Sequence, residues 1–240
     1  MKSKNKKLKV IILIILLVIL SVIIVSCITN PSTSEEAIDF LQKKYNREFT
    51  LISYEYGDIL SSIDYVHCTT DNINQEHESI TVAIRKEDGK VTFKDDYFSY
   101  LVRPELETYI SDMIKEEFQE IKIYAENQEH YLSNELTSES TLSDLYQIES
   151  SYIAEAKIYV KGNPEITKAE YERKMQNIRN KLLDSGHSYI IYLFVVSPEI
   201  YDSMGRYSQN DFWRFYAVNK EPDGNQYYYA YNEYIKGKEE

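Results

Sequence analysis

The chain has 240 residues, two cysteines and a formal net charge of −12. It is long enough to fold as one medium domain or two small ones, and two cysteines exclude a disulfide framework. Five of its 27 Lys and Arg residues precede Cys27. The chain from Cys27 onward therefore holds 22 basic residues against 39 acidic ones, a formal net charge of −17. A surface this acidic repels phosphate backbones, which excludes nucleic acid as the main partner.

A targeting signal is predicted at the start of the chain. Residues 10–25 are apolar except for Ser21, and a lysine-rich stretch precedes them, as in a charged region followed by the apolar core of a signal. As a helix this run would span about 24 Å, short of the roughly 30 Å hydrocarbon core unless the next residues extend it. A cleaved signal and a retained transmembrane anchor are both compatible with this pattern. Both place the rest of the chain outside, because the lysines stay cytoplasmic.

The signal ends in Ile24-Val25-Ser26-Cys27, which resembles the lipobox of bacterial lipoproteins. This resemblance implies that lipid is attached to Cys27 and that residues 1–26 are removed as a signal peptide. The whole chain is similar to the small, uncharacterised lipoproteins of Gram-positive, low-GC bacteria, in which a lipobox precedes a compact α+β body. The resemblance implies a lipid-anchored protein on the extracytoplasmic face of the cell membrane, with a single N-terminal transmembrane helix as the alternative.

After a linker at residues 27–33, we expect a first α+β lobe at residues 34–126. Thr33-Ser34-Glu35-Glu36 fits a capping box, so the first helix is expected to begin at Thr33. A longer helix is expected to begin at Pro104, because a single apolar stripe follows it. Strands are predicted at residues 49–56, 63–70 and 79–86, at residues 91–93 after the turn Asp88-Gly89, and at residues 121–125.

A polar connection at residues 127–149 is expected to lead to a second lobe at residues 150–240. Alternation from Ala154 to Val160 predicts a half-buried strand. A second capping box, Thr167-Lys168-Ala169-Glu170, begins a helix that Gly186 ends. The apolar stripe of this helix consists of Tyr171, Met175, Ile178 and Leu182.

Residues 189–196 are apolar throughout, which predicts a central strand covered on both faces. One helix can cover only one face, so the first half of the chain is expected to pack on the other. A closing hairpin is predicted from residues 212–218 and 226–234. The predicted fold class is therefore α+β: a signal or anchor helix followed by two packed α+β lobes with mainly antiparallel sheets.

Tyrosine is unusually frequent, with 23 residues, and it suggests a ligand platform. Strand alternation puts Tyr227, Tyr229 and Tyr231 on one face, and Trp213 could extend that face. Flat rings with polar tips stack on sugars or grip peptides. The simpler interpretation is that tyrosine is a good strand former that tolerates edges and surfaces.

Other candidate residues have simple structural interpretations. His67, Cys68 and His77 are metal-ligand types, but their spacing fits no zinc pattern. Alternation predicts that Cys68 is a small buried hydrophobe and that His67 lies on the opposite face. Asp95-Asp96 could serve as acid and base, but one of them more simply caps the segment before Pro104. Neither a glycine-rich phosphate loop nor a serine nucleophile motif occurs, and we predict no catalytic residue, metal or cofactor.

The leading hypothesis is a membrane-anchored binding or interaction module without enzymatic activity, acting on a cell-wall component, a peptide or a membrane-protein partner. The rival hypothesis is an envelope hydrolase that uses carboxylates the sequence does not single out. A third is a structural partner within an envelope complex. A deep pocket with converging acids of raised pKa would favour the enzyme, whereas a flat exposed aromatic face would favour binding.

Overall fold

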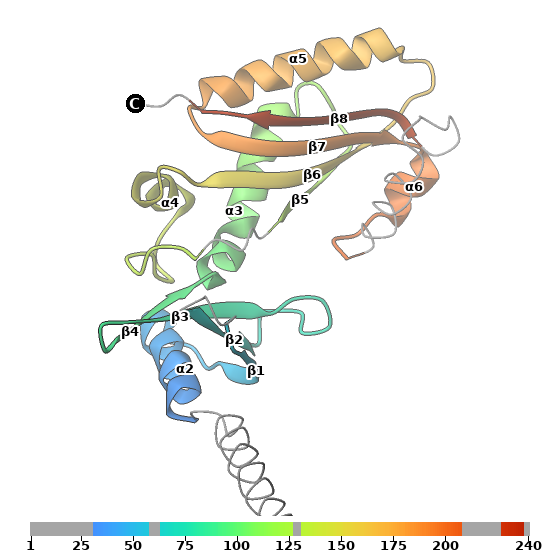
Figure 1. Ribbon diagram of the computed structural model, residues 1–240. Coiled ribbons are helices and arrows are strands. Elements are labelled where there is room, and N and C mark those ends of the chain that lie inside the picture. The colour runs from blue at the N-terminus through green and yellow to red at the C-terminus, as the bar shows by residue number, and fades with distance from the viewer. Residues whose placement is uncertain (1–30, 58–62, 127–130, 208–226, 238–240) are drawn as a thin grey trace, which may run out of the picture.

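The computed structural model describes residues 31–57, 63–126, 131–207 and 227–237 (Figure 1). The fold is α+β, with two four-stranded sheets in the orders β1-β2-β3-β4 and β5-β6-β7-β8. The apolar run at residues 10–25 and the lipobox lie outside the described residues. Within the described part of the chain, no helix has both the length and the apolar character needed to span a membrane.

The first sheet is antiparallel throughout, and helix α2 packs on one face of it (Figure 1). Helix α2 begins at Pro31, so the expected start at Thr33 is wrong: Thr33 is buried inside the first turn. Proline suits this turn because its missing N–H has no intrahelical acceptor there. The bounds are α2 Pro31–Tyr45, β1 Thr50–Glu55, β2 Ile63–Thr69, β3 Ile80–Glu87 and β4 Lys90–Asp95.

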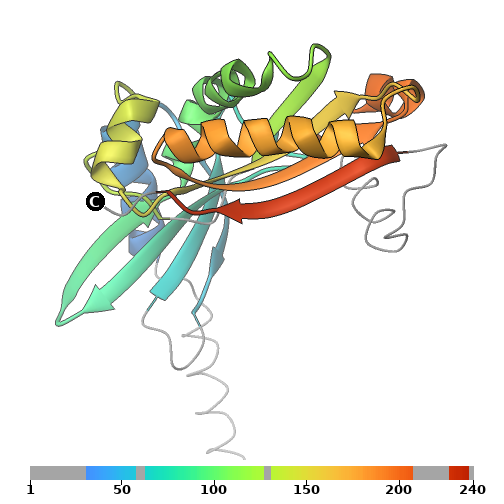
Figure 2. The same cartoon turned by 90° about the horizontal axis from the view of Figure 1, so that it is seen from above.

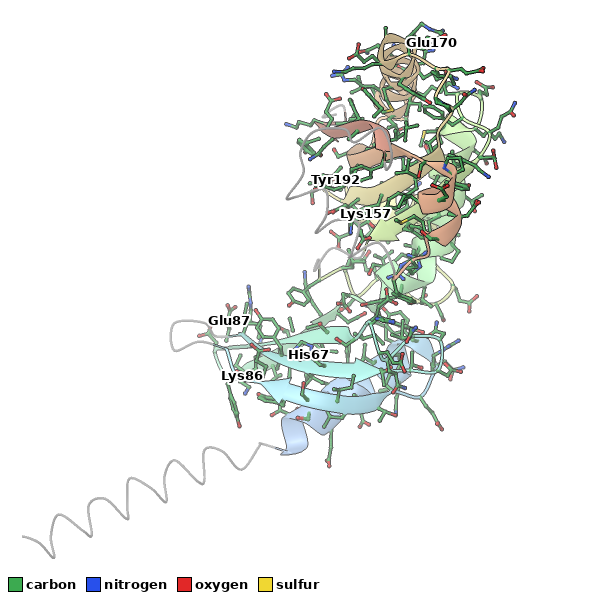
Figure 3. All side chains as sticks on the ribbon, turned by 90° about the vertical axis from the view of Figure 1, so that its right-hand side faces the viewer. His67, Lys86, Glu87, Lys157, Glu170 and Tyr192 are labelled. Atoms are coloured by element: carbon green, nitrogen blue, oxygen red, sulfur yellow. The ribbon has the colours of Figure 1, made fainter. Side chains whose placement is uncertain are left out.

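Two local predictions for this sheet are confirmed. On β2, Val66 and Cys68 are fully buried, whereas His67 lies between them on the opposite, partly exposed face (Figure 3). The turn between β3 and β4 has positive φ at both Asp88 and Gly89. That is the conformation of the tightest hairpin turns, and Gly adopts it without strain.

Helix α3 spans Tyr97–Ile114, so Pro104 lies inside the helix and the expected start there is wrong. Just before the helix, Asp95 Oδ1 accepts a hydrogen bond of 3.0 Å from the backbone N–H of Tyr97, while the N-cap residue Asp96 makes no side-chain capping hydrogen bond. The following strand, β5 Ile121–Glu126, pairs with β6 and therefore belongs to the second sheet rather than to the first lobe. Local periodicity indicates a strand but carries no information about its partner.

The second sheet contains the parallel pair β6–β7, which α5 connects, and two antiparallel edges. The capping box of α5 at Thr167 and Glu170, its buried stripe, and Gly186 with φ 81° are all confirmed. Seen from above, α5 lies over β7 and β8, and α3 lies beside it toward β5 (Figure 2). The bounds are α4 Leu142–Ile148, β6 Ile153–Lys161, α5 Lys168–Asp184, β7 Ser188–Val196, α6 Pro198–Ser203 and β8 Tyr227–Ile235.

Strand β7 lies between β6 and β8, as predicted, but the expected cover for its second face is wrong. On that face Phe194 and Val196 pack with Tyr159 and Met204 beneath α6, so a short helix from the same half covers one end. Toward the other end, Tyr192 pairs in register with Lys157, and both are only partly buried (Figure 3). Both faces of β7 are apolar enough to be buried, but other elements cover one of them only in part.

The segment predicted as a polar connection, residues 127–149, is more ordered than expected where the structure describes it. It contains helix α4, whose Thr141 and Asp144 form a capping box. Its apolar residues are sparse, but Leu132, Leu136, Leu142 and Leu145 are all buried. Of the closing hairpin, the structure describes β8, while residues 212–218 lie outside the described part.

Candidate functional site

An open groove of about 1520 Å³ is lined by residues of α4 and of the C-terminal end of β8. These two elements lie toward the same end of the second sheet (Figure 1). We call this groove the aromatic groove, because five of its lining residues carry rings: Tyr109, Tyr146, Tyr152, His187 and Tyr234. Serine hydroxyls, one side-chain amide and two charged side chains complete the polar part of the described lining: Ser143, Ser150, Ser151, Ser185, Ser188, Gln147, Glu105 and Lys236.

Helix α4 forms one wall of the groove, and hydrogen bonds fix its first turn. The backbone and side chain of Thr141 donate to Asp144 at 2.7 and 2.8 Å, which lowers the pKa of this carboxyl. The backbone N–H of Leu142 donates to Glu105 Oε2 of α3 at 2.9 Å. Buried Leu145 attaches the helix to the core. The wall is therefore preformed rather than assembled around a ligand.

The central feature of the groove is a stacked pair of rings. His187 follows Gly186, whose positive φ turns the chain from α5 into β7. The rings of His187 and Tyr146 are 3.6 Å apart and inclined by 4°, and Tyr109 lies 6.4 Å from His187. Burial lowers the pKa of His187, so the imidazole is neutral at pH 7. The pair therefore offers flat, uncharged area.

The hydroxyls of Tyr146 and Tyr152 remain protonated. Burial raises the pKa of Tyr152 to about 12 and that of Tyr146 still further. Nearby, Ser185 Oγ and Tyr189 Oη are 2.9 Å apart. The Tyr146 hydroxyl oxygen is itself buried, so the hydroxyls that the groove offers to a ligand are those of its serines, which can both donate and accept hydrogen bonds.

The segment that follows β8 closes the groove by a close backbone approach. A Cβ atom on Gly237 would lie 2.3 Å from the carbonyl oxygen of Gly186, so a larger residue does not fit without displacement. The N–H of Gly237 donates to Ser188 Oγ at 3.0 Å. This contact places Tyr234, whose side chain is 51% exposed, at the rim.

The predicted tyrosine platform and the aromatic groove are made of different residues. Tyr229 is 8% exposed and its ring stacks on Tyr171 of α5 at 5.9 Å. Tyr231 packs against the same core, and its hydroxyl bonds to Glu233. These two side chains therefore lie under α5, while Trp213, the side chain of Tyr227 and the lipid-attachment residue Cys27 lie outside the described residues. The platform as a whole stays a prediction.

Sequence reasoning missed the groove for two reasons. Tyr146 belongs to the segment that composition marked as a polar connection, and His187 lies in the turn after Gly186, where no sequence pattern singles it out. A usable signal was present in Thr141-Leu142-Ser143-Asp144, whose threonine and aspartate have capping-box spacing. Recognising that helix would have placed Tyr146 on an element rather than in a loop.

The remaining candidate residues are structural. Cys68 is buried on the α2 side of β2, as predicted, and burial raises the pKa of its thiol. His67 lies 3.4 Å from Glu55 and from Thr81. Asp96 Oδ1 accepts from the N–H of Thr81 at 2.9 Å. Across the described ranges, His, Cys, Asp and Glu side chains form no group of three suited to a metal ion.

Neither a known protein-family model nor a curated protein matches the chain. A crystal structure of a DUF5037 family protein from Ruminococcus gnavus is similar to it over 71% of this chain and 77% of that one. The two share 18% sequence identity, with a TM-score of 0.37. A similarity of this extent carries no argument about what the chain binds.

Proposed function

We propose that the chain is a lipid-anchored extracytoplasmic protein that binds a glycan of the cell envelope in its aromatic groove, without catalysing a reaction. The observation that carries this proposal is the composition of the groove lining, in which a stacked Tyr146–His187 pair lies among several hydroxyl groups. Rings stack on the apolar faces of sugars, and hydroxyls exchange hydrogen bonds with their edges. An open groove accepts a chain of sugars rather than a single one.

The groove supports binding better than hydrolysis. Glycoside hydrolases generally use two carboxyl groups that flank the bond to be cleaved. Among the described lining residues, Glu105 is the single carboxylic acid, and it already accepts the hydrogen bond from the N–H of Leu142. An envelope hydrolase stays the alternative, and it predicts that new reducing ends appear when the protein is incubated with its glycan.

The proposed location rests on the lipobox resemblance and on the short path to the body. Three residues separate Cys27 from Pro31, where α2 begins. Even fully extended, this path spans about 14 Å. A chain that is lipidated at Cys27 and cleaved after residue 26 would therefore hold its first sheet close to the outer face of the membrane. The full proposed architecture is this anchor followed by two packed α+β lobes.

Two experiments test the proposal. Metabolic labelling with a fatty-acid analogue should label the wild type and leave Cys27→Ala unlabelled, and equal labelling of both would exclude lipidation at this residue. For binding, the full chain in detergent is titrated calorimetrically with soluble glycan strands released from peptidoglycan. Tyr234→Ala should weaken binding about tenfold, which corresponds to about 1.4 kcal/mol.

The structure supplies a matched control for the binding experiment. Tyr56, like Tyr234, is 51% exposed, but it lies at the end of β1, outside the groove. Tyr56→Ala should bind the glycan strands as tightly as the wild type. Equal losses in Tyr56→Ala and Tyr234→Ala would show that adsorption is nonspecific, and no binding by the wild type would exclude this ligand class.

A further inference from the structure

A second, smaller cavity of about 130 Å³ lies between the two sheets, and four separate segments of the chain form it. In Figure 1 the chain after α6 descends from the second sheet toward the first, and Tyr207 there donates to Glu78 just before β3 at 3.2 Å. We call this cavity the joint pocket. Its side chains are His77, Glu78, Arg103, Ala125, Glu126, Arg206 and Tyr207.

Two guanidinium groups provide positive charge in the joint pocket. Arg103 of α3 has a side chain that is only 10% exposed, and its Nη1 lies 2.8 Å from Glu78 Oε1. Its buried Nε has no hydrogen-bond partner among the described residues. Arg206 is held by Glu107 and by the carbonyl oxygen of Ala125 at 3.2 Å. A buried guanidinium N–H without a partner costs free energy that an acceptor in the pocket would recover.

Two carboxylates provide negative charge in the same pocket. Glu78 binds Arg103 through one oxygen and Tyr207 through the other, so it is fixed in place. Glu126 lies 3.1 Å from Lys157. Each carboxylate oxygen has two lone pairs, so both groups can accept further hydrogen bonds without giving up these partners.

We infer that the joint pocket binds a small zwitterion, a free amino acid with a short side chain. Its carboxylate would face Arg103 and Arg206, and its ammonium group would face Glu78 and Glu126. A simple anion would be repelled by the two glutamates, and a simple cation by the two arginines, whereas a molecule with both charges matches both pairs. The cavity has room for several water molecules and therefore for a ligand of a few heavy atoms.

The test is a ligand-observed NMR titration of the full chain in detergent with glycine as the probe. Sodium acetate and methylamine, each carrying one of the two charges, are the comparison ligands at equal ionic strength. Glycine should bind at least tenfold more tightly than either. Binding of all three with equal strength, or of none, would overturn the inference and leave a pocket that holds only water.

Two variants make the test specific to the pocket. Arg206→Lys keeps the charge but loses the planar fork, and it should weaken glycine binding about tenfold. Glu126→Gln should change the affinities for glycine and acetate in opposite directions: glycine should bind more weakly and acetate more tightly. A loss of folding cannot produce opposite changes, so parallel changes in a folded Glu126→Gln protein would contradict the inference. Tyr234→Ala in the aromatic groove should leave glycine binding unchanged, which separates this test from that of the glycan.

Discussion

Lys44 of α2 donates a hydrogen bond of 2.8 Å to Asp95 at the end of β4, and the two side chains are 5% and 0% exposed. The same carboxylate accepts from the hydroxyl of Tyr45 at 2.7 Å and from the N–H of Tyr97 at 3.0 Å. The carbonyl oxygen of Asp95 accepts from the N–H of Leu132 at 3.0 Å. One residue thus connects α2, the start of α3 and the segment that leads to α4.

Removing the charge of Asp95 should strongly destabilise the protein. In Asp95→Asn, the ammonium group of Lys44 would stay buried without its counter-ion, and breaking such a pair costs about 3–5 kcal/mol. Urea unfolding should show this loss as a lower midpoint at an unchanged slope. Asp71→Asn is the control, because Asp71 and its partner Arg47 are both exposed. In Asp71→Asn the loss of unfolding free energy should stay below about 1 kcal/mol. Equal losses in the two variants would contradict the stabilising role given to the buried Lys44–Asp95 pair.

The stability of the protein should fall in mild acid, in part because of His187. Burial lowers the pKa of this imidazole in the folded state below the value of about 6.5 expected when unfolded. At a pH between the folded-state and the unfolded-state pKa, the unfolded chain binds the proton more readily than the folded one. The contribution of His187 to the free energy of unfolding is therefore fully present above pH 7 and is lost as the pH falls below 6.5. The free energy of unfolding should differ less between pH 7.5 and pH 5.5 in His187→Gln than in the wild type. A larger difference in the variant would contradict the conclusion that folding lowers the pKa of His187.

The thiol of Cys68 should be unreactive in the folded protein. It is fully buried, and burial raises its pKa, so the thiolate that reacts with alkylating agents is scarce. In a Cys27→Ala background, iodoacetamide should modify Cys68 only after urea is added. Rapid modification under native conditions would show that β2 opens readily. Cys68→Ser should lower the free energy of unfolding by about 1–3 kcal/mol, because it buries a hydroxyl in an apolar site.

The sequence predicts the elements of this protein better than their partners. The α5 capping box, the positive φ of Gly186 and the burial of Cys68 depend on neighbours within a few residues, so local patterns suffice. The pairing of β5 with β6 and the cover over Phe194 depend on distant segments, which periodicity does not encode. The aromatic groove also depends on distant segments, because its stacked rings come from helix α4, which carries Tyr146, and from the turn before β7, which carries His187.

The close contact between Gly237 and Gly186 gives the last prediction. An alanine Cβ at position 237 would lie 2.3 Å from the carbonyl oxygen of Gly186 and 2.8 Å from the carbonyl carbon of His187. These are backbone atoms, so the end of β8 must move away, and overpacking of this kind costs about 1–3 kcal/mol. Because the same movement displaces Tyr234 from the rim, Gly237→Ala should also weaken glycan binding. Asn232→Ala, at an exposed position of β8, should change stability by less than about 0.5 kcal/mol and leave binding intact. A Gly237→Ala protein with wild-type stability and affinity would show that the end of β8 does not need this contact.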